Sequence, residues 1–390
     1  MDVSFFIASR LRFKGKIATV CIAVSFLVMI IAVAVSSGFR KEIRDGLAAI
    51  SGDVQITPVD MNFIGGESPI ERYPAYMEHL ESLPGVADVM PAVYRAGIVK
   101  SGDNIHGVLL KGVPWMEEGE SSAPSVSIPS SLSALLGLHE GDEMLTYFVG
   151  ERVKVRKFHV KSVYRGILDT EDKIVVYAGL SDMQRLNGWD EDQVSAFDVI
   201  LDDRLRTISG MEEMAGEIGF VAYGHWKEGE ETVVASSAVH NYPQLFDWLG
   251  LIDFNVLVIL VLMTIVAGFN MVSGLLIMLF ENISTIGLLK ALGMTDRAIA
   301  KVFLASASSI VLKGMAIGNI LAFAICILQA RFHILPLDPA NYFVDSVPVH
   351  IESVKVMVAD IVSFIAIMLL LLLPSLFISR VDPAKTVAVR

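Results

Sequence analysis

The stretch ENISTIGLLKALGMTDRAIAKVF, Glu281–Phe303, decides how this chain is organised. It lies between two long apolar runs, Phe254–Phe280 and Leu304–Leu328. Apolar runs of this length predict membrane-spanning helices, because about 20 apolar residues cross the hydrocarbon core of a bilayer. The sequence therefore predicts a short amphipathic segment, 281–303, held between two membrane spans.

The composition is that of a membrane protein with one acidic hydrophilic block. Hydrophobic residues make up 53% of the 390 residues, and the mean hydropathy is +0.57. The net charge of −12 is uneven, since residues 40–253 carry 18 Lys/Arg against 35 Asp/Glu. Phosphates would be repelled by this block, so nucleic acid is excluded as its partner. Cys21 and Cys326 lie in apolar runs, so no disulfide staples the block.

The N-terminus fits either a cleaved signal peptide or a first membrane span. Residues 1–16 are basic, and Ile17–Ser37 follows as 21 residues without charge. We expect an uncleaved span, because the run exceeds a typical signal core and further spans follow. The apolar spacing continues through Phe39–Ile50, so the first helix is predicted over 17–50, with its end as a stalk.

The block 51–242 is predicted to be one domain of mixed α and β structure. Alternating apolar residues predict a hairpin around SGDN, 101–104, and paired strands on either side of Gly150. Pro129 and Gly137 frame a short helix, and 204–216 is predicted to be helical. No linker-like composition divides the block.

The predicted fold class is a membrane protein with four transmembrane helices and a large α+β extracytoplasmic domain between helices 1 and 2. Four, three, two and three Lys/Arg residues lie in the segments 1–16, 281–303, 329–355 and 379–390, respectively. By the positive-inside rule, both termini and the central loop are cytoplasmic and the acidic domain is periplasmic. The predicted segments are the cytoplasmic N-terminus 1–16, helix 1 with stalk 17–50, the domain 51–242, stalk and helix 2 243–280, the coupling loop 281–303, helix 3 304–328, a short periplasmic loop 329–355, helix 4 356–378 and the cytoplasmic tail 379–390.

Polar and small residues inside the spans indicate helix packing or a substrate path. Asn270 lies mid-span and is expected to face another helix, with Gly268 and Gly274 allowing close approach. Gly314 and Gly318 begin a small-residue seam in the third span. Lys313, in the same span, is expected to reach the inner headgroups, and its role stays open.

Within the coupling loop, Ser284 is predicted to start a helix and Gly293 to end it. The spacing predicts Ile286, Leu289 and Leu292 on one apolar face. Such a face either lies on lipid or fills a groove in a partner protein, and the spacing does not decide between these. A second helix starts after Thr295 and runs into the third span.

The sequence shows no catalytic or metal-binding pattern. It contains no HExxH, no GxSxG and no Cys/His spacing typical of a metal site. It also has no phosphate-binding loop, so the chain is not expected to be an enzyme or to bind a cofactor itself.

Several segments resemble a known family. They are Phe269–Phe303, the YFVDSVPV segment of 342–349 and the SRVDPA segment of 379–384. They are similar to the permease subunits of lipoprotein-releasing ABC transporters of the LolC/LolE type, within the wider MacB/FtsX-like permease group.

The resemblance implies a bacterial inner-membrane, multi-pass subunit that works by mechanical transmission. Two permeases, either sister chains or two copies of one, pair with two copies of a separate ATPase that binds ATP and Mg²⁺. A lipoprotein enters sideways from the outer leaflet, among membrane lipid, and passes to a periplasmic chaperone. The residues implied to dock on the ATPase are Ile286, Leu288, Leu289, Lys290, Leu292 and Met294.

One feature departs from the family. The chaperone-binding permease carries an extended hairpin with a proline, whereas the hairpin over 145–160 is short and has no proline. The chain is then either the partner without this hook or a homodimer that serves both roles. Two alternatives remain: a MacB-like exporter of peptides or amphiphiles, and an FtsX-like signalling permease that controls a cell-wall hydrolase.

Overall fold

The computed structural model describes residues 16–59, 68–102, 104–117, 124–149, 153–164, 166, 174–338, 342 and 344–375. The predicted tail 379–390 and nearly all of the N-terminal segment 1–16 lie outside this part of the chain. The chain divides into two compact units. The helical unit comprises 1–39, 250–336 and 347–390, and the sheet unit comprises 40–249 and 337–346.

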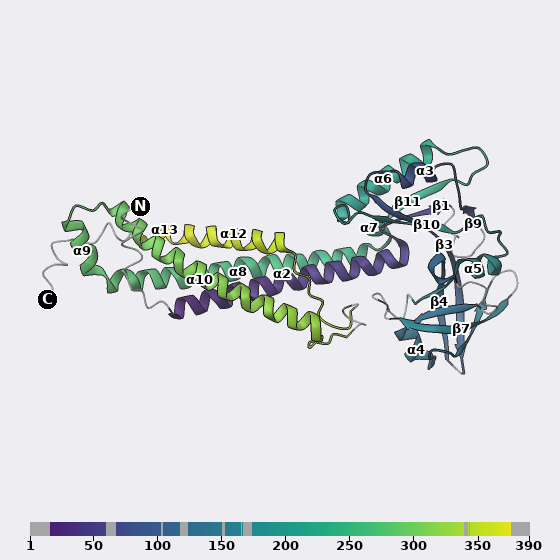
Figure 1. Cartoon of the computed structure of the whole chain (residues 1–390), viewed down its shortest axis with the longest axis horizontal. Helices are drawn as coiled ribbons and strands as arrows, with labels where there is room; N and C mark the ends of the chain where they lie inside the picture. The colour runs from purple at the N-terminus through teal and green to yellow at the C-terminus, as the bar shows by residue number, and fades with distance from the viewer. Residues whose placement is uncertain are drawn as a thin grey trace. The chain divides into compact units, whose positions relative to one another are not determined.

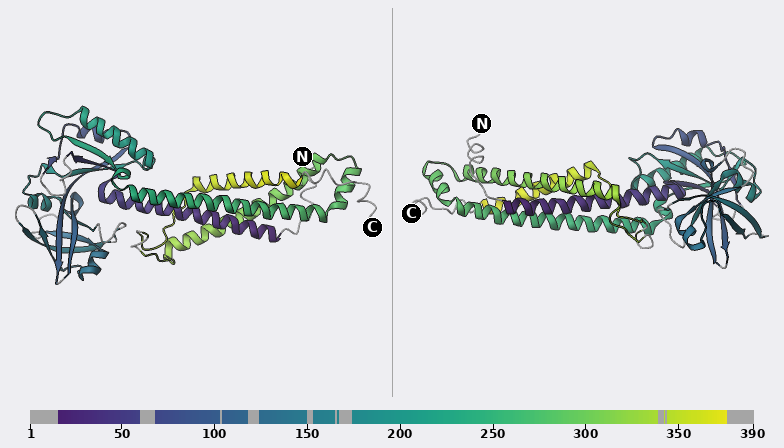
Figure 2. Two further views of the ribbon diagram at one scale, coloured as in Figure 1. Left: turned by 180° about the vertical axis from the view of Figure 1, so that it is seen from behind. Right: turned by 60° about the horizontal axis from the view of Figure 1, so that its bottom comes forward.

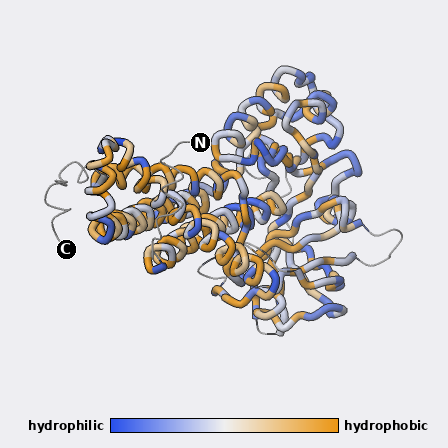
Figure 3. Tube along the Cα trace, turned by 60° about the vertical axis from the view of Figure 1, so that its left-hand side comes forward, coloured by the Kyte–Doolittle hydropathy of each residue, from blue (hydrophilic) through white to orange (hydrophobic). Residues whose placement is uncertain are grey.

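Four helices in the described residues are long and apolar enough to cross a membrane. They run side by side in the helical unit in the views of Figures 1 and 2. Hydrophobic residues predominate along them, as the orange of the tube shows (Figure 3). They are α2 (Lys16–Ser51), α8 (Pro243–Glu281), α10 (Asp296–Phe332) and α12 (Ser353–Leu370), the last followed by the short α13 (Leu372–Ser375).

Two helices differ in extent from the predicted spans. The second helix of the coupling loop and the third span form the single helix α10, and the Thr295 hydroxyl caps it by accepting from the Ala298 N–H. The fourth span is interrupted after Leu370. Leu370 lies four residues before Pro374, whose ring clashes with the carbonyl at that position in a continuous helix. Residues 376–378 of the predicted span lie outside the described residues.

The core of the helical unit lies between these helices. Phe26 of α2, Met271 of α8, Phe303 of α10 and Ile367 of α12 are each at most 1% exposed and belong to one cluster. All four long helices therefore bury a stripe against the same core.

The sheet unit contains a nine-stranded sheet with the order β11-β1-β10-β3-β4-β8-β5-β7-β6, and a two-stranded sheet of β2 and β9. The strands are β1 (Val54–Pro58), β2 (Ile70–Glu71), β3 (Val86–Ser101), β4 (Asn104–Val113), β5 (Ser125–Pro129), β6 (Glu143–Phe148), β7 (Lys154–Tyr164), β8 (Val175–Gly179), β9 (Gln193–Val194), β10 (Ala196–Leu201) and β11 (Val233–Ser237). The short helices are α3 (Met77–Glu81), η2 (Pro114–Met116), α4 (Ser130–Leu136), α5 (Leu180–Asn187), α6 (Ile208–Gly224) and α7 (Ala238–Asn241).

Strand β3 belongs to both halves of the nine-stranded sheet. Up to Ala92 it pairs with β10, and from Val93 it pairs with β4. Near its end, Ile98 to Lys100 also pair with β6, the last strand in the order. Helices α3 and α6 pack in the first half, with β1, β10 and β11, while α4 and α5 pack in the second (Figure 1). The two halves are therefore joined through the backbone of a single strand.

The predicted hairpins are confirmed. Strands β3 and β4 pair antiparallel up to Ser101 and Asn104, and β6 pairs antiparallel with β7. The turn at 150–152 lies outside the described residues.

The helix predicted over 204–216 is displaced. Helix α6 begins at Ile208, after the Thr207 hydroxyl accepts from the Gly210 N–H at 3.1 Å, and it runs to Gly224. Its buried face continues through Ile218 and Ala222 at helical spacing, which extends the helix beyond the predicted end.

Candidate functional site: the loop between α8 and α10

The coupling loop contains one short helix, α9 (Ile283–Ala291). Ser284, the predicted cap, lies inside this helix, and Asn282 occupies the cap position without a side-chain capping bond. The end of the helix is as predicted, because Gly293 adopts a left-handed φ of 88° that favours glycine. The Gly293 N–H donates to the Lys290 carbonyl at 2.9 Å and closes the turn.

One side of α9 is buried against the helical unit. Ile286 is 1% exposed and belongs to the core cluster, while Leu289 and Met294 pack against that cluster and are half-buried. The expectation that Ile286, Leu289 and Leu292 share one face is wrong, because Leu292 is 76% exposed. Leu292 caps the helix beyond its last turn, where the chain bends toward Gly293, so the helical spacing no longer applies to it.

The other side of α9 presents leucine side chains to the surroundings. Leu288 is 56% exposed and Leu292 is 76% exposed. Ser284, Thr285 and Ala291 are exposed beside them. An exposed apolar patch on a short, anchored helix is the kind of surface that a partner protein or a lipid layer covers.

Lys290 is held within the loop. Its ammonium lies 2.9 Å from Asp296 Oδ1, and its side chain is only 11% exposed. Asp296 is the first residue of α10, where a carboxylate also favours the helix dipole. The ion pair therefore ties α9 to α10 across the turn at Gly293. Of the six residues expected to dock, two are well exposed, three pack inward and Lys290 fixes the turn.

The predicted glycine seam of α10 lies against α2. A Cβ on Gly318 would lie 2.5 Å from the Ala23 carbonyl oxygen, and one on Gly314 would lie 2.7 Å from Ile22 Cγ2. Ala322, one turn further, is fully buried. The two backbones approach closely because these residues have little or no side chain.

The glycines of α8 also lie at helix contacts. A Cβ on Gly268 would overlap the Leu370 side chain of α12, and one on Gly274 would lie 3.5 Å from the Ala18 Cβ of α2. Asn270, between them, is half-buried. Helix α8 therefore meets α12 at Gly268 and α2 at Gly274.

Two polar contacts between the spans were not predicted. Asn319 of α10 donates to Asp360 of α12 at 2.6 Å, and the Thr264 hydroxyl of α8 lies 3.1 Å from that of Ser363 on α12. Asp360 and Ser363 are almost one helical turn apart, so one polar stripe on α12 meets both neighbours. Paired polar residues one turn apart in an apolar run are the sequence signal for this arrangement.

Within the described ranges, no group of three or more His, Cys, Asp or Glu residues is placed to hold a metal ion.

Residues 257–383, which include the coupling loop, match the family described as FtsX-like permease C-terminal. Over this region the chain is similar to FtsX-like permeases. The fold has four apolar helices long enough to cross a membrane and an α+β domain inserted between the first and second.

Curated relatives extend the similarity to nearly the whole chain. The lipoprotein-releasing system transmembrane protein LolC of Xylella fastidiosa (strain Temecula1) is 19% identical over 93% of this chain and 91% of its own. LolC of Neisseria meningitidis serogroup B is 21% identical, and LolE of Haemophilus influenzae is 20% identical, each over 96% of this chain and 94% of its own. The resemblance to permeases of the LolC/LolE type is confirmed.

Among solved structures, the periplasmic region of MacB from Actinobacillus actinomycetemcomitans is similar, with 12% identity and a TM-score of 0.30. The match covers 51% of this chain and 95% of that one.

Proposed function

We propose that this chain is the membrane subunit of an ABC transporter that extracts lipoproteins from the outer leaflet of a bacterial inner membrane and passes them to a periplasmic chaperone. The similarity to LolC and LolE over 93% to 96% of the chain supports this proposal. ATP and Mg²⁺ bind in a separate ATPase, present in two copies, and this chain performs no catalysis.

The observation that carries the proposal is the exposed leucine pair of α9. Leu288 and Leu292 present an apolar surface, while Ile286 and Leu289 anchor the same helix in the core. A partner that docks on the exposed side therefore acts directly on the packed bundle. In the proposed mechanism, closure of the ATPase displaces α9, and α8 and α10 move with it.

The glycine seam supplies the next step of this transmission. Helix α10 packs on α2 at Gly314 and Gly318, so displacement of α10 acts on α2. Helix α2 continues without interruption to Ser51, which belongs to the sheet unit. Movement is thus delivered to the sheet unit along one helix, and no pore through the protein is needed.

In the proposed topology, both termini and the coupling loop are cytoplasmic and the sheet unit is periplasmic. The basic segments beside the spans support this orientation. Reporter fusions at Gly119 and Thr295 are expected to report opposite sides of the membrane, and the same side for both would overturn the topology.

The hairpin segment 145–160 contains no proline, which supports a role without a chaperone-binding hook. We therefore place this chain either beside a hooked sister permease or in a homodimer with a second copy of itself. Co-purification in mild detergent, with mass identification of the bound chains, distinguishes the two assemblies.

The docking assignment is tested with Leu288→Asp and Leu292→Asp. A charge on an apolar surface that a partner buries is costly, so each variant is expected to insert normally but to lose ATPase binding and lipoprotein release. Leu288→Met and Leu292→Met, which keep an apolar side chain, serve as controls and should retain both activities. Full release by both Asp variants would remove α9 as the docking element.

A second candidate is a signalling permease that controls a cell-wall hydrolase through the sheet unit. The match of 257–383 to FtsX-like permeases favours it. Depletion of the chain separates the two functions: lipoproteins retained in the inner membrane support release, whereas altered wall turnover with normal lipoprotein sorting supports signalling.

A further inference from the structure

The last turn of α2 ends among side chains from several strands of the sheet unit. Lys111 of β4 donates from its ammonium to the carbonyl oxygens of Ala49 and Ile50, each at 2.9 Å. The Tyr177 hydroxyl of β8 donates to the Ala49 oxygen at 3.2 Å, and the Tyr94 hydroxyl of β3 lies 2.9 Å from the Ile50 oxygen. The final carbonyls of a helix lack intrahelical donors and carry its negative end, so these side chains satisfy them.

A buried carboxylate completes this group. Asp198 of β10 lies 2.6 Å from the Lys111 ammonium, and the two side chains are 1% and 3% exposed. Gln55 of β1 donates to Asp198 at 3.0 Å and to the Tyr94 hydroxyl at 3.1 Å. Five strands thus supply one residue each to what we call the α2 joint: Gln55, Tyr94, Lys111, Tyr177 and Asp198.

The hydroxyls of the α2 joint remain donors at neutral pH. Burial, and then the charge of Asp198, raises the pKa of Tyr94 well above its usual range. The same two causes raise the pKa of Tyr177 to about 12. Both phenols therefore keep their hydrogens.

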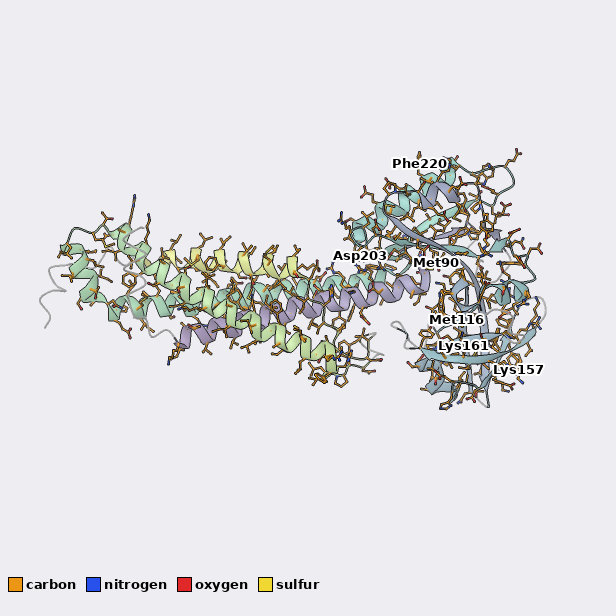
Figure 4. All side chains as sticks on the ribbon, viewed as in Figure 1. Met90, Met116, Lys157, Lys161, Asp203 and Phe220 are labelled. Atoms are coloured by element: carbon orange, nitrogen blue, oxygen red, sulfur yellow. The ribbon has the colours of Figure 1, made fainter. Side chains whose placement is uncertain are left out.

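A second set of ion pairs holds the same end of α2. Arg206, in the loop after β10, lies 2.9 Å from Asp53 and 3.2 Å from Asp45 of α2. Arg44 of α2 donates to the Arg206 carbonyl at 3.4 Å. Asp203, labelled in Figure 4, lies at the exposed edge of this set, 3.8 Å from Arg44.

The connection from α2 into the sheet is short and tightly packed. Only Gly52 and Asp53 separate α2 from β1. Gly52 has a φ of 70°, and a Cβ there would lie 2.8 Å from the backbone nitrogen of Val199. The Asp53 carboxylate also accepts from the Leu201 N–H at 3.0 Å. A junction this short and this crowded cannot act as a flexible linker.

The α2 joint differs from an ordinary surface ion pair. The pair of Lys157 and Glu143, on β7 and β6, has side chains that are 56% and 50% exposed, and Lys157 lies on the outside of the sheet unit (Figure 4). Exposed pairs of that kind contribute about 0–1 kcal/mol. Buried, mutually satisfied charges instead fix one arrangement, since breaking the set leaves an unpaired buried charge.

We infer that the α2 joint is a rigid coupling, which makes the end of α2 and the sheet unit move as one body. This inference rests on the proposed function, in which closure of the ATPase displaces α2. A rigid joint would make the sheet unit move together with α2. The residues of the joint are positioning residues: in this proposal they transmit movement and bind no substrate.

The test removes hydroxyls and leaves the buried charges paired. Tyr94→Phe/Tyr177→Phe takes away two contacts to the α2 carbonyls while keeping the rings. Tyr164→Phe is the matched control, since the Tyr164 hydroxyl donates to the Val175 carbonyl of β8 at 2.6 Å. If the double variant folds poorly, Tyr177→Phe alone is used.

Rigidity is measured in the full-length chain in nanodiscs, without the ATPase. Spin labels are placed at the exposed positions Lys41 of α2 and Arg156 of β7, with Cys21 and Cys326 replaced by alanine. We expect a broader distribution of label distances in the double variant than in the parent and in Tyr164→Phe. A distribution as narrow as that of the parent overturns the inference.

Coupling is measured in the assembled transporter as lipoprotein released per ATP hydrolysed. We expect this ratio to fall in the double variant while ATPase binding and hydrolysis persist, and to stay unchanged in Tyr164→Phe. A broadened distribution with an unchanged ratio would show that the joint does not transmit movement. If the parent complex releases no lipoprotein, the proposed function fails, yet the label distances still decide whether the joint is rigid.

Discussion

Asn319 of α10 donates a hydrogen bond to Asp360 of α12, with 2.6 Å between Nδ2 and Oδ2. The remaining side-chain oxygens, Asn319 Oδ1 and Asp360 Oδ1, are buried and have no hydrogen-bond partner in the structure. An amide and a carboxyl thus join two membrane helices and satisfy only part of each other's bonding capacity.

This pair predicts that replacing one of the two residues destabilises the chain more than replacing both. Asn319→Leu leaves the Asp360 carboxyl without its donor, and an unsatisfied buried group costs about 1–3 kcal/mol. Asn319→Leu/Asp360→Leu removes both polar groups and is expected to recover much of that loss. Thermal unfolding in detergent checks the order, and a double variant less stable than the single one would contradict it.

Close packing of α10 on α2 predicts that Gly318→Val destabilises the helical unit. The new side chain would meet the Ala23 carbonyl and the Phe26 Cβ, which lies 2.9 Å from the position of a Cβ. Overpacking of this kind costs about 1–3 kcal/mol. Gly250→Ala is the control, since nothing lies within 4 Å of a Cβ there and alanine favours a helix by roughly 0.5–1 kcal/mol. Equal unfolding temperatures for the two variants would contradict close packing of α10 on α2 at Gly318.

The ion pair of Lys290 and Asp296 predicts a functional loss with little change in stability. Lys290→Met removes one pair whose carboxylate side chain is 47% exposed, so the free energy of unfolding should change by about 1 kcal/mol or less. The substitution also removes the ion pair that fixes the turn beside Leu288 and Leu292. Binding of the proposed ATPase to these two residues should therefore weaken. Unfolding and ATPase pull-down are measured on the same preparation. Unchanged binding would show that the ion pair is not needed for docking.

The raised pKa of Tyr177 predicts a loss of stability at alkaline pH. The pKa is about 12 in the folded chain, against the ordinary value of 10.0. Between these values the unfolded chain releases this proton and the folded chain keeps it, so stability falls as pH rises. The contribution is complete below pH 10.0 and is lost as pH passes through about 12. Tyr177→Phe, which has no proton to release, should unfold with a shallower pH dependence over this window. Equal slopes would contradict the assignment.

The sequence predicts the helical unit well because its signals are local. Long apolar runs mark α2, α8 and α10, and small residues four apart mark the seam at Gly314 and Gly318. The exposed side of α9 was misassigned because Leu292 caps the helix, and the spacing rule holds only for residues inside one.

The sheet unit was less predictable because its decisive contacts are distant in sequence. Lys111 and Asp198 are separated by 86 intervening residues, and neither occupies a recognisable motif. The first half of β3 was also missed. Pro91 lies within it, and proline within a run argues against a strand because it cannot donate to a ladder.

Strand β3 makes the sheet unit indivisible. Its 16 residues pair with β10 at one end and with β4 and β6 at the other, so any cut between the halves severs a continuous backbone. A chimaera that borrowed only one half from a relative would need a new strand in register with three neighbours at once: β10, β4 and β6.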